Sequence, residues 1–246
     1  MFSLDHKTAL ITGAGQGVGL GIATAIAKQG ATVLINDIDT ARAETAARSL
    51  QARGFKAEPL SFDVTDRHAV KKAIDSRTTA IDILINNAGN AGDTAMPQMP
   101  FTEMPIELIE RFVDINLQAV IHCTQAVLPN MQRRQWGRVI TISSDAGRVG
   151  LGIGVSAYGA AKAGASNLMR HLSQEVGKYN ITANSISLGL MNNVPDEFAA
   201  QLVRTIPVGR LGTPEDAGAM SVFLASNESA WVTGQTLVLN GGSNAC

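Results

Sequence analysis

The amino-acid sequence predicts one doubly wound α/β domain, residues 1–246, built on a parallel sheet of about seven strands. Two observations lead to this fold class. Short apolar runs rich in β-branched residues alternate along the chain with segments long enough to be helices, and such alternation is typical of α/β folds. The apolar runs are nearly continuous, as expected of strands that helices cover on both faces. No linker or fixed-period repeat interrupts the pattern.

The expected strands cover residues 8–12, 31–36, 57–62, 81–86, 138–143, 181–187 and 235–240. The expected helices between them cover residues 17–29, 40–53, 66–77, 105–133, 156–178 and 214–225. The last helix has the clearest start. Thr213 can cap its first turn, Pro214 fits the first helical position, and the carboxylates of Glu215 and Asp216 favour the positive end of the helix dipole.

The composition excludes several classes of protein. Lys and Arg number 20 against 21 Asp and Glu, and the formal net charge of −1 gives no general attraction to nucleic acid or to a membrane. Cys123 and Cys246 lie far apart and the 4 histidines have no metal-binding spacing, so we expect neither a disulfide framework nor a metal site. The N-terminus has no apolar run long enough for a signal peptide or membrane span, and a cytoplasmic protein is expected.

A glycine-rich turn follows the first expected strand. Residues 12–19 read TGAGQGVG, with glycines at positions 13, 15, 17 and 19. Glycines at a strand-to-helix turn let the backbone approach a pyrophosphate, and the amino end of the following helix attracts the phosphates. Many other loops also carry glycines, but the position of this one favours a dinucleotide site in a Rossmann-like fold.

Asp37 ends the second expected strand, about 20 residues after the glycine turn, where an acidic residue is typical of dinucleotide sites. A carboxylate there can accept hydrogen bonds from the adenosine ribose hydroxyls, and it repels a 2′-phosphate. Neither Gln16 nor Ile38 offers a cation for that phosphate. NAD(H) is therefore the expected cofactor, rather than NADP(H). The alternative is that Asp37 only caps the helix expected over 40–53.

Tyr158 and Lys162 lie four positions apart in the run SAYGAAKAG, residues 156–164. On a helix this spacing puts both side chains on one face. An ammonium near a phenol favours the phenolate and is expected to lower the pKa of the phenol from about 10. Such a phenol can exchange a proton with a substrate oxygen near neutral pH. The alternative is that Tyr158 belongs to the core and Lys162 to the solvated surface.

Several motifs occur in an order that resembles the short-chain dehydrogenase/reductase family. They are the glycine turn 12–19, Asp37, FDV (62–64), NNAG (86–89), Asn116 within DINL, the serine pair 143–144, YGAAK (158–162) and TGQTLVLNGG (233–242). The resemblance extends over nearly the whole chain. It implies an oxidoreductase that transfers a hydride between a nicotinamide dinucleotide and a secondary alcohol or ketone.

The resemblance also implies roles for the matching residues. Tyr158 would be the general acid and base, and Ser144 would hydrogen-bond the substrate oxygen. Lys162 would bind the nicotinamide ribose and lower the pKa of the phenol, while Asn116 would hold a water that links Lys162 to solvent. Asp63 and Val64 would contact adenine, and residues 87–89 would line the adenosine ribose. The full set of expected cofactor-binding residues is Thr12, Gly13, Gln16, Gly17, Val18, Gly19, Asp37, Asp63, Val64, Asn87, Ala88, Gly89, Tyr158, Lys162, Gly189 and Asn193.

The chain departs from the family pattern in five places. Ser144 and Tyr158 are fourteen positions apart, one more than the family pattern, and Ser143 competes for the role of Ser144. Leu188 stands where the family has proline. Asn193 replaces a threonine that binds the nicotinamide carboxamide, although its amide keeps a donor and an acceptor. The loop over 90–106 is longer than usual and the segment 191–205, the family's substrate lid, is shorter.

The substrate is expected to be an apolar secondary alcohol or its ketone, either alicyclic or linked to acyl-CoA. Expected substrate contacts are Ser144, Asp145, Leu151, Leu188 and Met191, and Met96, Met99 and Met104 are further candidates for an adaptable apolar lining. The run SSDAGRVG resembles family members that oxidise alicyclic alcohols or hydroxyacyl-CoA thioesters. Within that run Arg148 either meets an anionic group or belongs to the surface.

Two other functions are considered. An NADPH-dependent 3-oxoacyl-carrier-protein reductase is disfavoured by the charge of Asp37 and by the lack of a cation at positions 16 and 38. A dinucleotide sensor without turnover is disfavoured because the four implied catalytic residues, Asn116, Ser144, Tyr158 and Lys162, are all present.

The helix expected over 156–178 has small residues at positions 160, 161 and 163–165. Because these side chains are short, another helix can pack closely against it. The family resemblance implies a homotetramer or homodimer that associates through the helices over 105–133 and 156–178. The alternative is that these small residues serve packing within one subunit.

Overall fold

The computed structural model describes residues 1–90, 96–194 and 196–244, and it confirms the expected parallel sheet. Its 7 strands lie in the order β3-β2-β1-β4-β5-β6-β7, and all paired neighbours are parallel. The strands are β1 (Thr8–Ile11), β2 (Thr32–Ile35), β3 (Ala57–Pro59), β4 (Ile83–Asn86), β5 (Gly137–Ser144), β6 (Ile181–Leu188) and β7 (Thr236–Leu239). Each lies where an apolar run predicted it.

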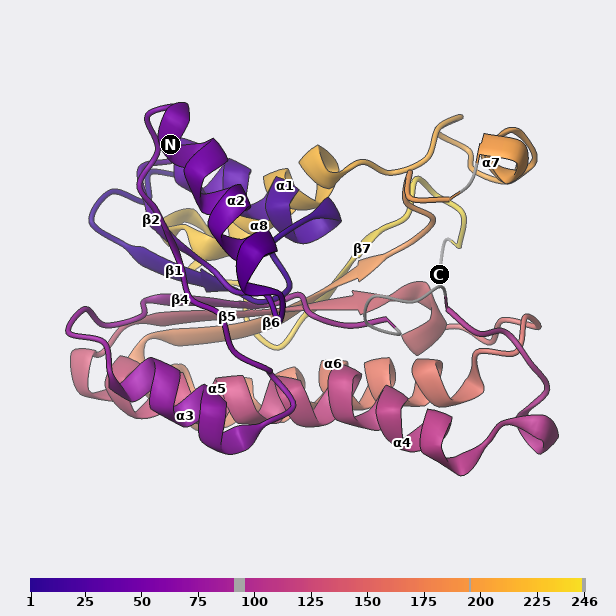
Figure 1. The fold of residues 1–246 in the computed structure, drawn as a ribbon, viewed down its shortest axis with the longest axis horizontal. Coiled ribbons are helices and arrows are strands. Elements are labelled where there is room, and N and C mark those ends of the chain that lie inside the picture. The colour runs from indigo at the N-terminus through magenta and orange to yellow at the C-terminus, as the bar shows by residue number, and fades with distance from the viewer. Residues whose placement is uncertain (91–95, 195, 245–246) are drawn as a thin grey trace.

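The helices cover both faces of the sheet, as parallel strands require of their crossover connections. They are α1 (Gly17–Lys28), α2 (Thr40–Ala52), α3 (Arg67–Asp75), α4 (Ile106–Val113), α5 (Ala119–Arg134), α6 (Ser156–Val176), α7 (Asp196–Val203) and α8 (Pro214–Ala225). Figure 1 shows α1, α2 and α8 on one face and α3, α4, α5 and α6 on the other. Helix α1 packs against α8, and α4 packs against α6.

The helix expected over 105–133 is divided into two. Helices α4 and α5 are joined by a π-helical segment, Asp114–Gln118, which contains the buried Asn116. Single π-helical turns inside α-helices are frequently found at functional sites. Helix α7 was not expected, because a segment of 8 residues is too short to show a clear helical period.

The predicted start of α8 is confirmed. The Asp216 carboxylate accepts a hydrogen bond from the backbone N–H of Thr213 at 2.8 Å, and the Thr213 hydroxyl accepts one from the N–H of Asp216 at 3.4 Å, which makes a capping box. The guanidinium of Arg210 holds the pKa of Asp216 well below its usual range. A Cβ added to Gly21 of α1 would lie 2.2 Å from the Cβ of Pro214. The absent side chain therefore lets α8 begin directly against α1.

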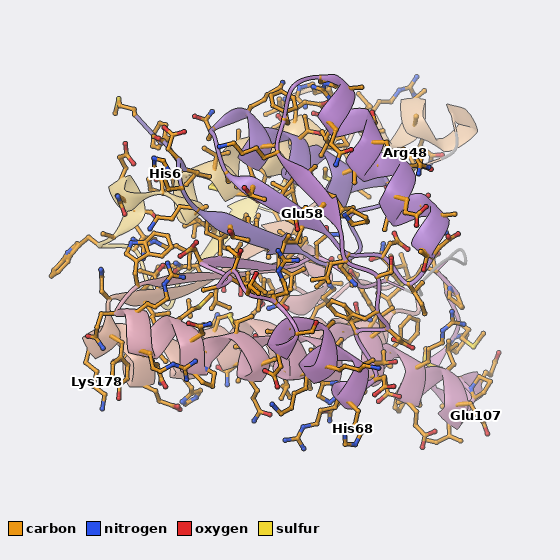
Figure 2. The ribbon with its side chains drawn as sticks, turned by 60° about the vertical axis from the view of Figure 1, so that its left-hand side comes forward. His6, Arg48, Glu58, His68, Glu107 and Lys178 are labelled. Carbon is orange, nitrogen blue, oxygen red and sulfur yellow. The ribbon has the colours of Figure 1, made fainter. Side chains whose placement is uncertain are left out.

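The core is aliphatic and lies on both faces of the sheet. Side chains such as Ile11 and Ile85 face the layer of α1 and α8, whereas Leu10 and Leu84 face the opposite layer. This burial on both sides explains why the strand sequences are continuously apolar. Many charged side chains lie on the outer surface of the helices, as Figure 2 shows for Arg48 on α2. Within the described ranges no helix has the length and apolarity needed to cross a bilayer.

Candidate active site

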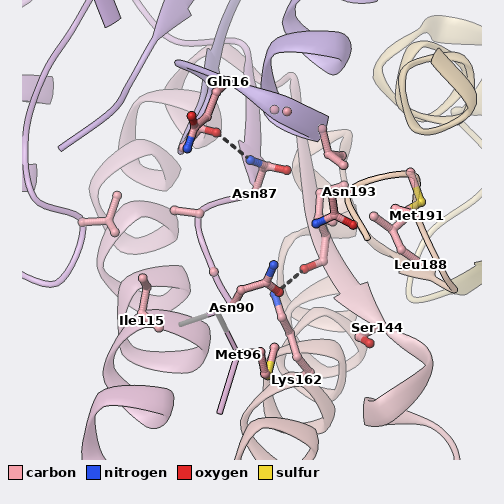
Figure 3. A pocket seen from close by; sticks show the side chains of 18 of the residues that line it. Gln16, Asn87, Asn90, Met96, Ile115, Ser144, Lys162, Leu188, Met191 and Asn193 are labelled. Carbon is pink, nitrogen blue, oxygen red and sulfur yellow. Dashed lines mark hydrogen bonds between the residues drawn. The ribbon is translucent and has the colours of Figure 1, made fainter. Parts of the chain in front are cut away.

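A pocket of about 990 Å³ lies at the carboxyl ends of the central strands. Strands β2 and β3 lie on one side of β1, and the chain then crosses to β4 on the other side of β1. Ligands of open α/β sheets bind in the crevice that such a reversal creates. Figure 3 shows Gln16 and Asn87 towards one end of this pocket and Met96 and Lys162 towards the other.

Most of the expected site residues lie at the pocket wall: Gly13, Gln16, Gly17, Val18, Gly19, Asp37, Asp63, Val64, Asn87, Ala88, Gly89, Ser144, Tyr158, Lys162, Leu188, Gly189, Met191 and Asn193. The fold thus brings together residues from segments far apart in the sequence. Their contacts with a cofactor or substrate stay predictions. Wall residues that sequence analysis did not identify include Arg42, Asn90, Gln98, Arg111, Ile115, Leu190 and Val194.

The glycine turn forms a cradle in front of α1. Gly13 has a left-handed φ of 60°, and a Cβ on it would lie 2.9 Å from the Cα of Ala88. A Cβ on Gly19 would lie 2.2 Å from the carbonyl oxygen of Gly13. Gly17, with a φ of 55°, begins α1 beside open space. This cradle fits a pyrophosphate, since a helix amino end and bare backbone meet at the pocket wall.

Thr12 does not line the pocket, which corrects its expected role as a cofactor contact. It is buried behind the glycine turn, and its hydroxyl accepts hydrogen bonds from the backbone N–H groups of Asn87 and Ala88, each at 3.0 Å. The Asn87 side chain in turn donates to the carbonyl of Thr12 at 2.9 Å. Thr12 therefore ties the turn after β1 to the segment after β4.

The Asp37 carboxylate lies at the pocket wall and is not the helix cap. Asp39 caps α2 by accepting from the N–H of Ala41 at 2.8 Å. Asp37 accepts from the N–H of Gly15 at 3.2 Å and from the guanidinium of Arg42 at 2.8 Å. Arg42 is a cation beside the expected ribose site that inspection of positions 16 and 38 missed. The predicted helix start at residue 40 could have revealed it, because the first turn of that helix adjoins Asp37.

Tyr158 and Lys162 are both buried, with exposed fractions of 6% and 4%, so the alternative of a solvated lysine is wrong. The Lys162 Nζ donates to the carbonyl of Ile142 at 2.8 Å and lies 5.8 Å from the centroid of the Tyr158 ring. Burial lowers the pKa of Lys162 from 10.5 to about 8.

The expected lowering of the Tyr158 pKa is wrong for the protein by itself. Burial raises the pKa of this phenol, and the Ser144 hydroxyl opposes that rise. Desolvation disfavours the phenolate and also disfavours the ammonium whose charge was expected to stabilise it.

Ser144 is better placed than Ser143 to meet a substrate. The Ser143 hydroxyl donates to the carbonyl of Lys162 at 3.2 Å and accepts from the Ser166 hydroxyl at 2.8 Å, and it is buried. Ser144 is half-buried at the pocket wall, where it accepts from the N–H of Ala146 at 3.2 Å. The geometry therefore agrees with the choice of Ser144.

Asn116 is fully buried behind the pocket wall, and its amide holds Asn90. The Asn116 Nδ2 donates to the carbonyls of Asn90 at 2.9 Å and Phe112 at 3.0 Å, and its Oδ1 accepts from the N–H of Asn90 at 3.0 Å. The Tyr158 hydroxyl donates to the Oδ1 of Asn90 at 3.2 Å. The only sequence signal for Asn90 was its place directly after the NNAG motif. The role of Asn116 in holding a water stays a prediction.

Two expected substrate residues lie away from the pocket. The buried Asp145 accepts from Ser187 at 3.1 Å and Asn240 at 2.8 Å and pairs with Arg148 at 3.2 Å, so it ties β5 to the C-terminal segment. Leu151 lines a separate cavity of about 220 Å³. These positions correct both expectations, because the turn after β5 directs its side chains away from the main pocket.

The expected methionine lining is divided between pocket and core. Met96 lines the pocket, whereas Met99 and Met104 pack in a cluster with Phe112 and Tyr158. Residues 91–95 of the loop expected to be long lie outside the described residues. Among the residues that the structure describes, no group of three or more His, Cys, Asp or Glu side chains is placed to hold a metal ion.

A family model described as enoyl-(acyl carrier protein) reductase matches residues 13–244. The chain is 36% identical to the 5-keto-D-gluconate 5-reductase of Escherichia coli (strain K12), over 98% of this chain and 97% of the relative. It is 34% identical to the 3-oxoacyl-(acyl-carrier-protein) reductase FabG of Vibrio harveyi, over 98% of both chains.

Solved structures show the same relationship. A 7α-hydroxysteroid dehydrogenase complexed with NADH and 7-oxo glycochenodeoxycholic acid superposes with a TM-score of 0.90 at 33% identity, over 98% of this chain and 95% of that one. A gluconate 5-dehydrogenase from Burkholderia cenocepacia J2315 in complex with NADP and tartrate gives 0.91 at 33% identity, over 98% and 96%. The chain belongs to the short-chain dehydrogenase/reductase family, whose members include oxidoreductases acting on alcohols and ketones with nicotinamide dinucleotides.

Proposed function

We propose that this protein is an NAD(H)-dependent oxidoreductase that interconverts a small secondary alcohol and its ketone. The observation that carries the proposal is the position of the buried Tyr158 and Lys162 at the wall of a pocket whose other end is formed by the glycine cradle and Asp37. A candidate proton-transfer group and the residues expected to bind a dinucleotide thus share one crevice.

The residues of this pocket can perform the proton chemistry of such a reaction. A nicotinamide dinucleotide, when bound, accepts or supplies the hydride. In ketone reduction the Tyr158 hydroxyl gives its proton to the substrate oxygen, and in alcohol oxidation the Tyr158 oxygen takes the proton back. The Ser144 hydroxyl is a second donor to the oxygen on which negative charge develops. Lys162, charged when its pKa of about 8 exceeds the ambient pH, favours the phenolate needed for oxidation.

NAD(H) is proposed over NADP(H) because the Asp37 carboxylate lies beside the expected ribose site. The neighbouring Arg42 supports a second candidate, an NADPH-dependent 3-oxoacyl-carrier-protein reductase, because a guanidinium there can meet a 2′-phosphate. The ion pair at 2.8 Å means that Arg42 partly neutralises the group that would exclude that phosphate. Solved relatives have been complexed with NADH and with NADP. The choice between NAD(H) and NADP(H) therefore depends on the Asp37–Arg42 ion pair.

A titration with NADH and NADPH, followed by nicotinamide fluorescence, tests the cofactor. We expect NADH to bind at least about tenfold tighter, a gap of about 1.4 kcal/mol. Asp37→Ala should remove most of that gap, and Arg42→Ala should weaken NADPH more than NADH. Equal or tighter binding of NADPH by the wild type would contradict the NAD proposal and favour the 3-oxoacyl-carrier-protein reductase.

We propose that the substrate has an apolar part, because Met96, Leu188, Leu190, Met191 and Val194 contribute apolar side chains to the pocket wall. A screen of acyclic and alicyclic secondary alcohols with NAD⁺ tests this step. Tight NADH binding without turnover of any alcohol, ketone or acyl thioester would instead indicate a dinucleotide sensor.

We also propose that the protein is a homotetramer, or failing that a homodimer, through the faces of α4, α5 and α6. Within one subunit Ala161 and Ala165 are already buried and Gly164 packs against Leu117, so only part of the small residues at 160, 161 and 163–165 is left for another chain. Light scattering should give about four times the chain mass of 25.8 kDa. A single-chain mass would contradict the proposal.

A further inference from the structure

Asn90 has a fixed backbone at the centre of the pocket. Its φ of 61° is left-handed, a conformation that asparagine tolerates better than most residues. The side chain of the fully buried Asn116 bonds both its N–H and its carbonyl, at 3.0 and 2.9 Å. Because the backbone is held on both sides, the direction in which the Asn90 side chain leaves it is set as well.

The Asn90 amide occupies the hydrogen bond that a substrate oxygen requires. The Tyr158 hydroxyl donates to the Asn90 Oδ1 at 3.2 Å, and a phenol has only one hydrogen to donate. A substrate oxygen that receives the proton of Tyr158 must therefore replace Asn90 as the acceptor. Figure 3 shows Asn90 directed towards the part of the pocket that contains Lys162 and Met96, so the displaced amide remains beside the bound substrate.

A displaced amide without a partner costs free energy, and a substrate that offers a new partner avoids that cost. An oxygen on the carbon next to the reacting carbon lies about one hydrogen-bond length from the reacting oxygen, which places it within reach of Asn90. The amide can accept from a hydroxyl and donate to a carbonyl. We propose that Asn90 is a specificity residue, and that the substrate carries a second hydroxyl or oxo group on the carbon adjacent to the one that is oxidised or reduced. This inference rests on the proposed function and narrows its substrate class.

Matched pairs of alcohols test this inference. Cyclohexanol is compared with the cis and trans forms of 1,2-cyclohexanediol, and 2-butanol with 2,3-butanediol, each with NAD⁺. For the wild type we expect kcat/KM of the better diol to exceed that of its mono-alcohol by about tenfold, the effect of one ordinary hydrogen bond. Asn90→Gly, which tolerates the left-handed backbone, should remove this preference, because it takes away both the amide that a mono-alcohol leaves unpaired and the partner of the diol's second hydroxyl. Asn90→Asp keeps an acceptor for the second hydroxyl and should retain the preference.

The outcomes distinguish a failure of the Asn90 inference from a failure of the proposed oxidoreductase function. A purely structural role of Asn90 would lower kcat/KM of both members of a pair alike and leave their ratio unchanged in Asn90→Gly, which would overturn the inference. Equal rates for diol and mono-alcohol in the wild type would overturn it too, while the oxidoreductase itself stands. The lack of turnover of any alcohol or ketone with bound cofactor would overturn the proposed function and this inference together.

Discussion

Tyr158→Phe is expected to lower kcat for alcohol oxidation by a factor of about 10²–10⁴, the usual contribution of a general acid or base. The phenyl ring keeps the packing against Phe112, whose ring centroid lies 6.0 Å away, and removes only the hydroxyl. NADH affinity should therefore change little. The measurement is steady-state oxidation with NAD⁺, combined with a fluorescence titration of NADH.

Tyr179→Phe is the matched control, because Tyr179 is the other of the 2 tyrosines in the chain and follows the end of α6, away from the pocket. It should keep wild-type kcat. If Tyr158→Phe retained most of the wild-type rate, another group would have to carry the proton, and the assignment of Tyr158 would be withdrawn.

Lys162→Met is expected to abolish turnover and yet to stabilise the ligand-free protein at pH 7. Burial lowers the pKa of Lys162 from 10.5 to about 8, which corresponds to about 3 kcal/mol against the charged form at 1.36 kcal/mol per pKa unit. The substitution also leaves the carbonyl of Ile142 without this donor, at a cost of about 1–3 kcal/mol. The net gain in the free energy of unfolding is therefore about 0–2 kcal/mol, measured by urea denaturation.

The sign of this effect depends on pH. Below pH 8 the lysine is charged in both states, so wild type bears the whole penalty. Between pH 8 and 10.5 the folded lysine loses its proton before the unfolded one does, so wild-type stability rises relative to the variant. By pH 10 the advantage of Lys162→Met should fall to zero or reverse, since the neutral amine still donates to Ile142. Lys178→Met on the surface (Figure 2) should show no such dependence. A variant that is less stable at pH 7 would mean that the desolvation penalty is smaller than the hydrogen bond.

Both predictions concern a pair of side chains that the fold buries, Tyr158 and Lys162. A buried lysine and a buried phenol each destabilise their own charged forms, and the protein retains them although apolar residues would pack there at lower cost. Functional sites commonly carry such local costs. In the ligand-free protein Tyr158 is hydrogen-bonded to Asn90, and burial raises its pKa where the spacing of Tyr158 and Lys162 suggested a lowered one.

The sequence by itself determined the sheet and the helices that cover it, apart from α7 and the π-helical turn around Asn116. These elements could be predicted because each depends on residues close together in the sequence, as the β-branched runs, the glycine turn and the Thr213 cap show. The same holds for the dinucleotide cradle and for the helical face shared by Tyr158 and Lys162. Only the tertiary structure decided which side chains face one another. It placed Arg42 against Asp37, Asn90 against Tyr158, and Asp145 away from the pocket, because pairing and desolvation depend on neighbours that are distant in the sequence.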